Sequence, residues 1–140
     1  MGLVVRYGDG RVETRCITFT EETLTGLEVL ERSGIPIVVD PTGSFGPAVC
    51  KIDGEGCQYP QEDCFCHCQQ LGATCEYWAY YHLRGDHWEY SGEGAGTYVV
   101  HPGDVEGWAW GVGEPGQGAA PPLITWQEIC NPTPPTPTPT

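Results

Sequence analysis

The chain contains 140 residues, of which nineteen are acidic and six are basic, and its formal net charge is −13. This charge excludes nucleic acids and anionic membrane surfaces as favoured partners, because both carry negative charge themselves. No apolar stretch approaches the roughly 18 residues that a membrane-spanning helix requires, so direct membrane insertion is not expected. Eight cysteines beside one methionine indicate a disulfide scaffold and an extracellular or cell-surface location.

The N-terminal part of the chain predicts a β-hairpin followed by one short helix. Strand-forming residues on both sides of the turn GDG make 3–19 a hairpin. The segment 24–36 carries helix signals at both ends. Thr25 and Glu28 form a capping box, and Gly34 supplies a C-terminal stop.

Residues 40–75 are expected to form a loop-rich insertion that contains six of the eight cysteines. A zinc site could use Cys64, Cys66, His67 and Cys68, but repeated C-x-C does not match the C-x₂₋₄-C pairs of zinc sites. In an extended segment, alternate cysteines instead point to one side, and each can pair with a cysteine from elsewhere. We therefore favour disulfides and expect no bound metal.

The sequence limits the choice of disulfide partners without fixing all of them. Cys50, Cys57 and Cys75 are the nearest partners for the three cysteines of the C-x-C-x-C run, and their individual pairing stays open. Cys16 and Cys130 remain, and we expect them to pair with each other. On the chain-entropy model, closing a loop this long stabilises the fold by roughly 4–5 kcal/mol.

Residues 75–111 predict a second hairpin around the RGD turn at 84–86, followed by two further strands, 96–100 and 105–111. The tripeptide is interpreted as turn chemistry rather than as an integrin ligand. In the first strand of this hairpin, alternation places Tyr77 and Tyr81 on one face and Trp78, Tyr80 and His82 on the other.

The aromatic side chains of this region allow two interpretations. One set packs in the core while the insertion covers the rest, or some of them form an exposed platform for sugar rings or for another subunit. The candidate ligand or interface aromatics are Trp78, Tyr80, Trp88, Tyr90 and Trp126.

The C-terminal part predicts a linker, a strand and a tail. Residues 112–122 have the Gly/Pro composition of a flexible linker, 123–130 is expected to be a strand, and 131–140 is a Pro-Thr tail that favours polyproline II. Threonines in such tails are typical O-glycan acceptors. The candidate glycosylation sites are Thr133, Thr136, Thr138 and Thr140.

No complete catalytic or cofactor motif is present. The chain lacks a G-x-S-x-G motif, a P-loop and a dinucleotide fingerprint. Asp53 and Glu55 lie close together but match no complete calcium loop. A small hydrolase that uses two carboxylates is a remaining alternative, but we expect a non-enzymatic protein without a cofactor. The four histidines, on separate elements, form no visible site: His67, His82, His87 and His101.

A pattern of two W-x-Y pairs, a glycine cluster, Y-x-V, Gly-Asp and a final Trp extends over the second half of residues 3–111. The matching residues are Trp78, Tyr80, Trp88, Tyr90, Tyr98, Val100, Gly103, Asp104 and Trp108. This pattern resembles the β-grasp domain at the C-terminus of transcobalamin and intrinsic factor, which bacterial surface proteins of unknown function also carry. The resemblance implies an α+β fold with a β-grasp-like mixed sheet, one short grasped helix at 24–34 and an additional disulfide-rich insertion. Cobalamin binding does not carry over, because the helical barrel that supplies most vitamin contacts is missing.

These observations together favour a secreted, non-enzymatic structural protein of the cell surface. It would be the subunit of a glycosylated fibril that self-associates head to tail through 123–130 and the tail, with O-linked glycans as further partners. The alternative is a monomeric carbohydrate- or small-ligand-binding module on a Pro-Thr stalk.

Overall fold

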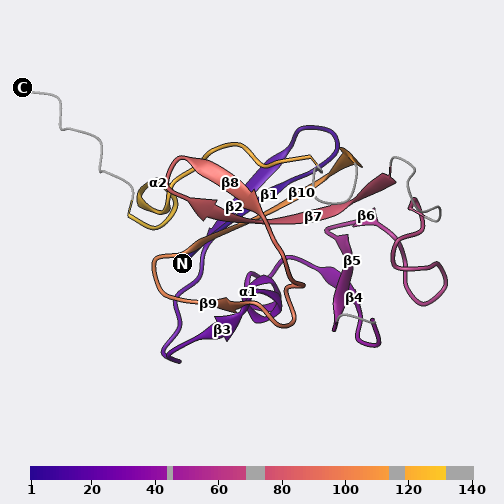
Figure 1. The fold of residues 1–140 in the computed structure, drawn as a ribbon, viewed down its shortest axis with the longest axis horizontal. Helices are drawn as coiled ribbons and strands as arrows, with labels where there is room; N and C mark the ends of the chain where they lie inside the picture. The colour runs from indigo at the N-terminus through magenta and orange to yellow at the C-terminus, as the bar shows by residue number, and fades with distance from the viewer. Residues whose placement is uncertain (44–45, 69–74, 114–118, 132–140) are drawn as a thin grey trace, which may run out of the picture.

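The computed structural model describes residues 1–43, 46–68, 75–113 and 119–131. Five strands form the central sheet: β1 (Gly2–Arg6), β2 (Val12–Cys16), β7 (Cys75–Arg84), β8 (His87–Tyr90) and β10 (Val105–Gly113). Their order is β2-β1-β10-β7-β8, and β1 runs parallel to β10 while the other neighbours are antiparallel (Figure 1). This arrangement confirms the predicted α+β class with a β-grasp-like mixed sheet.

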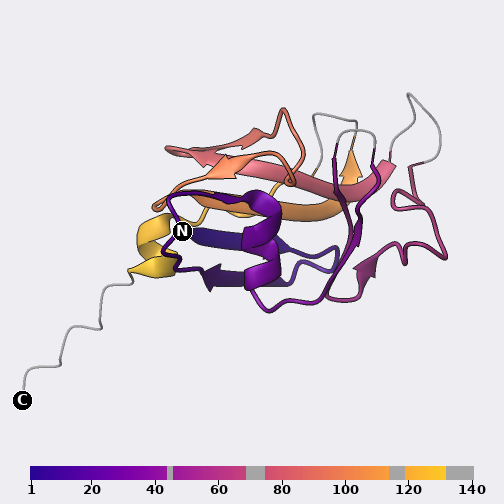
Figure 2. The same ribbon diagram turned by 90° about the horizontal axis from the view of Figure 1, so that it is seen from below.

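The helix α1 (Gly26–Arg32) begins where the sequence predicted. Thr25 is its N-cap, and the capping box with Glu28 is complete. Val29 and Leu30 are fully buried in the cluster that also contains Leu3 of the sheet, so α1 covers one sheet face (Figure 2). Two short strands pair beside the helix, β3 (Leu24–Thr25) and β9 (Val99–Val100).

The insertion contains more regular structure than the loop that the sequence predicted. A separate sheet joins β4 (Ile37–Asp40), which ends where the insertion begins, to β5 (Ala48–Ile52) and β6 (Glu55–Gly56) within it. Asp53 and Gly54 connect β5 to β6, and both have positive φ, 43° and 84°. This is the conformation that a two-residue Asp-Gly hairpin turn needs. The Asp-Gly pair therefore makes a turn, and its signal was overlooked in the sequence.

All eight cysteines are paired in disulfides, and the predicted bond between Cys16 and Cys130 is present. The other three bonds lie in or beside the insertion and join neighbours in the chain: Cys50–Cys64, Cys57–Cys66 and Cys68–Cys75. Disulfides in this number are typical of proteins from oxidising compartments. Among the described residues, no helix is long and apolar enough to cross a membrane.

The predicted C-terminal strand 123–130 is wrong, because this segment contains the helix α2 (Trp126–Cys130). Thr125 and Glu128 form a capping box that initiates it, and the sequence T-W-Q-E carried this signal. Cys130 then ties α2 to β2 of the same chain. The helix cannot serve as a strand donated to another copy while that bond is intact.

The predicted linker 112–122 also differs from the structure where it is described. Its first two residues extend β10, and Pro121 is buried. Ideal Cβ atoms on Gly107 and Gly111 of β10 would lie 2.7 Å from Pro121 and 2.6 Å from Ala119, so the segment packs closely on β10. Trp88 of β8 donates a hydrogen bond to Pro122 O at 3.2 Å. The absence of side chains on the two glycines is what lets this segment cover the sheet.

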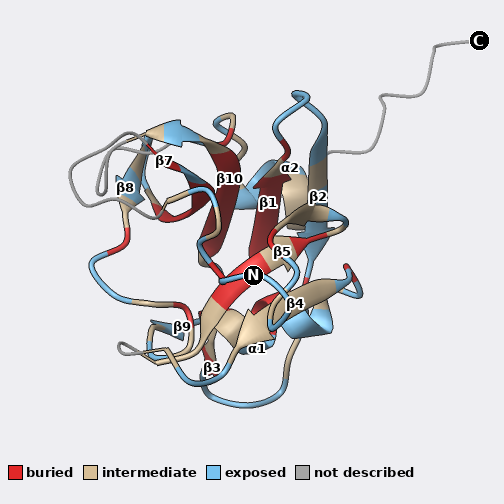
Figure 3. Cartoon of the chain, turned by 90° about the vertical axis from the view of Figure 1, so that its right-hand side faces the viewer, coloured by how far each residue is buried: buried red, intermediate tan, exposed pale blue. Residues whose placement is uncertain are grey.

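Buried residues are concentrated in β1, β7 and β10 (Figure 3), and they form one cluster on each face of the sheet. Trp78 and Tyr80 belong to the cluster under α1, whereas Tyr77 and Tyr81 form a second cluster with Trp88. The predicted alternation along β7 is thus correct, and neither face of this strand is an open aromatic platform.

Candidate functional site

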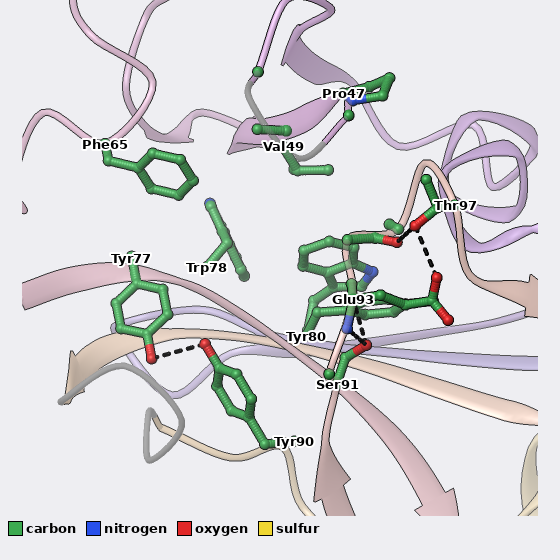
Figure 4. Close-up of a pocket in the computed structure, with 17 residues that line it drawn as sticks. Pro47, Val49, Phe65, Tyr77, Trp78, Tyr80, Tyr90, Ser91, Glu93 and Thr97 are labelled. Carbon is green, nitrogen blue, oxygen red and sulfur yellow. Dashed lines mark hydrogen bonds between the residues drawn. The ribbon is translucent and has the colours of Figure 1, made fainter.

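A groove of about 590 Å³ lies between the insertion and the edge of the central sheet. This volume is within the range of small-molecule pockets. Pro47, Val49 and Phe65 line it on the insertion side, opposite aromatic residues of the sheet (Figure 4). The aromatic residues that line it are Phe65, Tyr77, Trp78, Tyr80, Tyr90 and Trp108.

The groove exists because β8 is shorter than β7. β8 pairs only with Tyr81–Arg84, and after Tyr90 the chain leaves the sheet. Ser91 N–H still donates to Tyr80 O at 2.9 Å, which shows that the main-chain groups of Tyr80 point away from β10. By strand alternation those of Trp78 do so too. Among the described residues, no strand lies beside Tyr77–Tyr80 on this side, so the edge of β7 borders the groove.

Hydrogen bonds and ring packing fix the aromatic wall on the sheet side. Tyr90 donates its hydroxyl to the Tyr77 hydroxyl at 3.1 Å, and Trp78 Nε1 donates to Glu55 O at 2.8 Å (Figure 4 shows the tyrosine pair). Tyr80 stacks on Trp108 with ring centroids 4.5 Å apart and an interplanar angle of 17°. Trp108 Nε1 is buried and has no acceptor among the described residues. The wall is therefore preorganised, with few free polar groups.

Phe65 forms the opposite wall and is 45% exposed. It lies between Cys64 and Cys66, whose disulfides reach β5 through Cys50 and the segment after β6 through Cys57. Two cross-links on adjacent residues restrict the backbone of Phe65 although few apolar neighbours surround it. Aromatic side chains that face one another across a preformed cavity are a common feature of ligand pockets.

Ser91, Glu93 and Thr97 form the polar end of the groove (Figure 4). Thr97 Oγ1 donates to Glu93 Oε2 at 2.9 Å, and Ser91 Oγ donates to Glu93 O at 2.6 Å. Among the described residues that line the cavity, Glu93 is the one with a carboxyl group. The groove thus combines an aromatic end with a small polar end.

A buried polar network lies beneath the loop that contains Ser91, Glu93 and Thr97, called the groove loop below. Glu106 accepts a hydrogen bond from the Tyr80 hydroxyl, and its Oε2 lies 2.8 Å from His82 Nδ1. His82 Nε2 lies 2.8 Å from Ser91 Oγ. Burial is the main reason that the pKa of Glu106 lies above its usual value, although its hydrogen bonds with His82 and Tyr80 act in the opposite direction. Burial and the neighbouring Glu106 raise the pKa of Tyr80.

The order Ser91, His82, Glu106 matches that of a serine, a histidine and an acid in hydrolases. Ser91 Oγ, however, already has three partners, which are His82 Nε2, Glu93 O and Glu93 N. Three hydrogen bonds use the full capacity of a hydroxyl group, so no lone pair remains for attack on a substrate. We interpret the network as the support that connects the groove loop to β7 and β10.

Within the part of the chain that the structure describes, one group of potential metal ligands is close together, namely Cys57, Cys66 and His67, with ligand atoms within 4.8 Å of one another. The two sulfurs are bonded to each other, so neither is a thiolate, and metal coordination by cysteine needs the thiolate. His67 alone is left, and the donor set does not fit a metal in the oxidised protein.

The five predicted aromatic candidates divide between different places. Trp78, Tyr80 and Tyr90 come together at the groove. Trp88 lies beneath Pro122, on the face of the sheet opposite Trp78 and Tyr80 and shared with Tyr90, and Trp126 is on α2 and 36% exposed. The candidate glycosylation sites Thr133, Thr136, Thr138 and Thr140 lie outside the described residues.

Three residues of the groove were not among the candidates predicted from the sequence, namely Pro47, Val49 and Phe65. No local signal could have indicated Pro47 or Val49, because only the folding of the insertion brings them to the sheet edge. A bulky aromatic residue between two cysteines, as in C-F-C, was the available signal for Phe65.

Comparison with known proteins gives one family and one fold relative. A family described as the SCO2322-like domain matches residues 70–138, which contain β7, β8, β9, β10 and α2. The structure resembles a crystal structure from Ruminococcus gnavus described as a "putative metal binding protein", with a TM-score of 0.53 and 18% identity. The similarity covers 80% of this chain and 95% of that one and concerns the fold alone. No curated protein matches the chain.

Proposed function

We propose that this chain is a secreted, non-enzymatic binding module that takes a neutral ligand into the groove between the insertion and β7. One observation supports the proposal above all others. Phe65 is exposed, is restrained by disulfides on both sides, and faces the aromatic edge of β7 across an open cavity. Ligand pockets are lined mainly by apolar and aromatic side chains held in place before the ligand binds.

The chemistry of the groove defines the class of ligand. Its walls offer ring faces and edges, and its polar groups are few and include the carboxylate of Glu93. A formal charge of −13 repels anionic ligands. The ligand is therefore neutral and presents flat, largely apolar faces, as the rings of sugars or of prolines do.

The setting of the module follows from its cross-links and its tail. Four disulfides suit a protein outside the cell, where the Pro-Thr segment would act as a spacer. The sheet order supports kinship with the β-grasp domain of transcobalamin and intrinsic factor. Metal binding, the property named for the Ruminococcus protein, finds no support in the donor set around Cys57 and Cys66.

The test is a binding titration on the whole chain, followed by tryptophan fluorescence and calorimetry. The probes are neutral gluco-, xylo- and chito-oligosaccharides and a proline-rich peptide. We expect at least one probe to bind, and Phe65→Ala to weaken it by about tenfold or more, equivalent to about 1.4 kcal/mol.

Trp126→Ala is the matched control, because Trp126 is comparably exposed but lies on α2. It should leave binding unchanged, and both variants should unfold within about 0.5 kcal/mol of the parent. If no probe binds at millimolar concentration, or if Phe65→Ala and the parent bind alike, the groove is not the binding site.

A further inference from the structure

We infer that the occupant of the groove is the Pro-Thr tail of a second copy, residues 131–140, so that the chain assembles head to tail. The inference depends on the proposed function, because it names the ligand of the same groove. It assigns contact roles to Phe65 and to the β7 edge that neither the family match nor the fold relative supplies.

The chemistry of the tail matches the chemistry of the groove. Its sequence, NPTPPTPTPT, contains two overlapping P-x-x-P patterns, from Pro132 to Pro135 and from Pro134 to Pro137. Such segments adopt polyproline II, lose little entropy on binding, and are recognised by aromatic-lined grooves. The tail also has no ionisable side chain, so the acidic body of a second copy does not repel it.

The edge of β7 supplies the main-chain partner that a polyproline II ligand needs. The carbonyl groups of such a ligand make no internal hydrogen bonds. The N–H of Trp78 points toward the groove by the alternation that Tyr80 and Ser91 establish. Prolyl rings would lie between Phe65 and the aromatic side chains of the sheet, and the Trp78 N–H would fix the register of the bound tail.

The position of the tail favours a second copy over the chain's own groove. Cys130 is bonded to Cys16 on β2, three strands away from β7, and α2 lies at the opposite end of the sheet from β4–β6 (Figure 1). Strand spacing and rise put about 20 Å of sheet between this anchor and Trp78. A tail of ten residues in polyproline II reaches about 31 Å. Most of this length would be needed to pass around its own sheet before the tail reached the groove of the same chain.

The contact surfaces therefore differ, since one copy offers its C-terminus and the next its groove. Such heterologous contacts do not close on themselves except in rings, and they generate filaments when repeated. Assembly through a strand donated from 123–130 is prevented, because the Cys130 disulfide holds this segment as α2 beside β2 of its own chain. The tail contains no cysteine, so assembly through the tail is not restricted in this way.

Sedimentation velocity of the full chain over a range of concentrations tests the assembly. We expect the parent to form larger species as concentration rises, and negative-stain images to show filaments. Two variants should remain monomeric: Phe65→Ala, and a full-length chain in which the five tail prolines are alanine. Val12→Ala, on exposed β2 away from the groove, should assemble like the parent.

A peptide-binding experiment distinguishes failure of this inference from failure of the proposed binding function. The synthetic peptide NPTPPTPTPT is titrated into the tail-proline variant, with NATAATATAT as control. We expect the first peptide to bind, the control to bind at least tenfold more weakly, and Phe65→Ala to weaken binding by at least tenfold. If oligosaccharides bind in the groove but the peptide does not, the inference fails while the binding function stands. If neither binds, both fail. Peptide binding that is indifferent to Phe65→Ala would place the tail elsewhere and also overturn the inference.

Discussion

The β-grasp sheet and the cysteine-rich insertion are stabilised in different ways. In the sheet, apolar side chains such as Leu3, Val5 and Trp108 form a continuous core with α1, and one disulfide joins β2 to α2, 114 positions apart in the chain. In the described part of the insertion, Val49 and Ile52 face that core. The other buried side chains there are cystine halves, namely Cys50, Cys57, Cys64 and Cys75.

This difference shows how a small domain can present a rigid aromatic surface. A wall that depended on its own hydrophobic core would have to bury Phe65, whereas short-range cross-links fix the backbone and leave the side chain exposed. Global stability and the shape of the groove should therefore respond to different substitutions. Removal of the long-range disulfide should weaken the fold, and removal of a short-range one should mainly alter the groove.

The largest expected effect is the loss of the Cys16–Cys130 bond in the double variant Cys16→Ser, Cys130→Ser. The bond spans 114 positions of the chain, so its removal should lower the free energy of unfolding by about 5 kcal/mol on the chain-entropy model. Urea denaturation at pH 7 measures this loss. Any ligand should still bind at a temperature where the variant is folded, because the groove lies at the other end of the sheet.

The matched control is Cys57→Ser, Cys66→Ser, which removes a bond that spans 9 positions. The same model gives a loss of only about 3 kcal/mol. This variant should lose binding in the groove, since Phe65 is next to Cys66. Equal losses of stability in the two variants, or unchanged binding in the second, would contradict the proposed division of roles.

A second prediction concerns the buried network beneath the groove loop. Glu106→Ala leaves the Tyr80 hydroxyl and His82 Nδ1 without the partner that both now share. Breaking such a buried pair should lower the free energy of unfolding by about 3 kcal/mol. Glu106→Gln keeps an acceptor for Tyr80 and should cost less. Glu89→Ala, an exposed acid on β8, should change stability by less than about 0.5 kcal/mol.

These variants should be compared by urea denaturation at a single pH. If Glu106→Ala unfolds with the same midpoint as Glu89→Ala, the network contributes nothing to the sheet, and the loop that bears Ser91 must be positioned by other contacts. The insertion, rather than this network, would then be the main determinant of the shape of the groove.

The sheet was more predictable than the insertion for a physical reason. Both hairpins, the helix with its Thr25–Glu28 box and the alternation along β7 are encoded in local patterns, and the structure confirms them. The Cys16–Cys130 pair followed because no other partner was left for either residue. The β5–β6 turn at Asp53–Gly54 and the helix that begins after Thr125 were also predictable from the sequence. An Asp-Gly hairpin turn and a Thr-x-x-Glu capping box are local signals, and both are present at these places.

The groove could not be predicted in the same way. It depends on where β8 stops pairing with β7 and on how the insertion folds back over the free edge. Neither property has a local signal, because long-range packing determines both. The sequence identified Trp78, Tyr80 and Tyr90 as candidates but could not separate them from Trp88, which the segment after β10 covers.

The smallest expected effect concerns an exposed ion pair in the β-grasp half. Arg32 of α1 hydrogen-bonds the Glu21 carboxylate and holds its pKa at about 2, below the usual 4.5. Because the folded-state pKa is depressed, the pair stabilises the fold above pH 4.5, and this contribution should fade as the pH falls from there toward 2. Both side chains are about two-fifths exposed, so the effect should be small and should weaken further in high salt. Glu21→Gln should flatten the dependence of stability on pH between these values, which thermal unfolding at several pH values can measure. Binding in the groove should not change. A profile identical to that of the parent would show that the pair contributes nothing, leaving the apolar core and the long-range disulfide as the stabilising elements of this half.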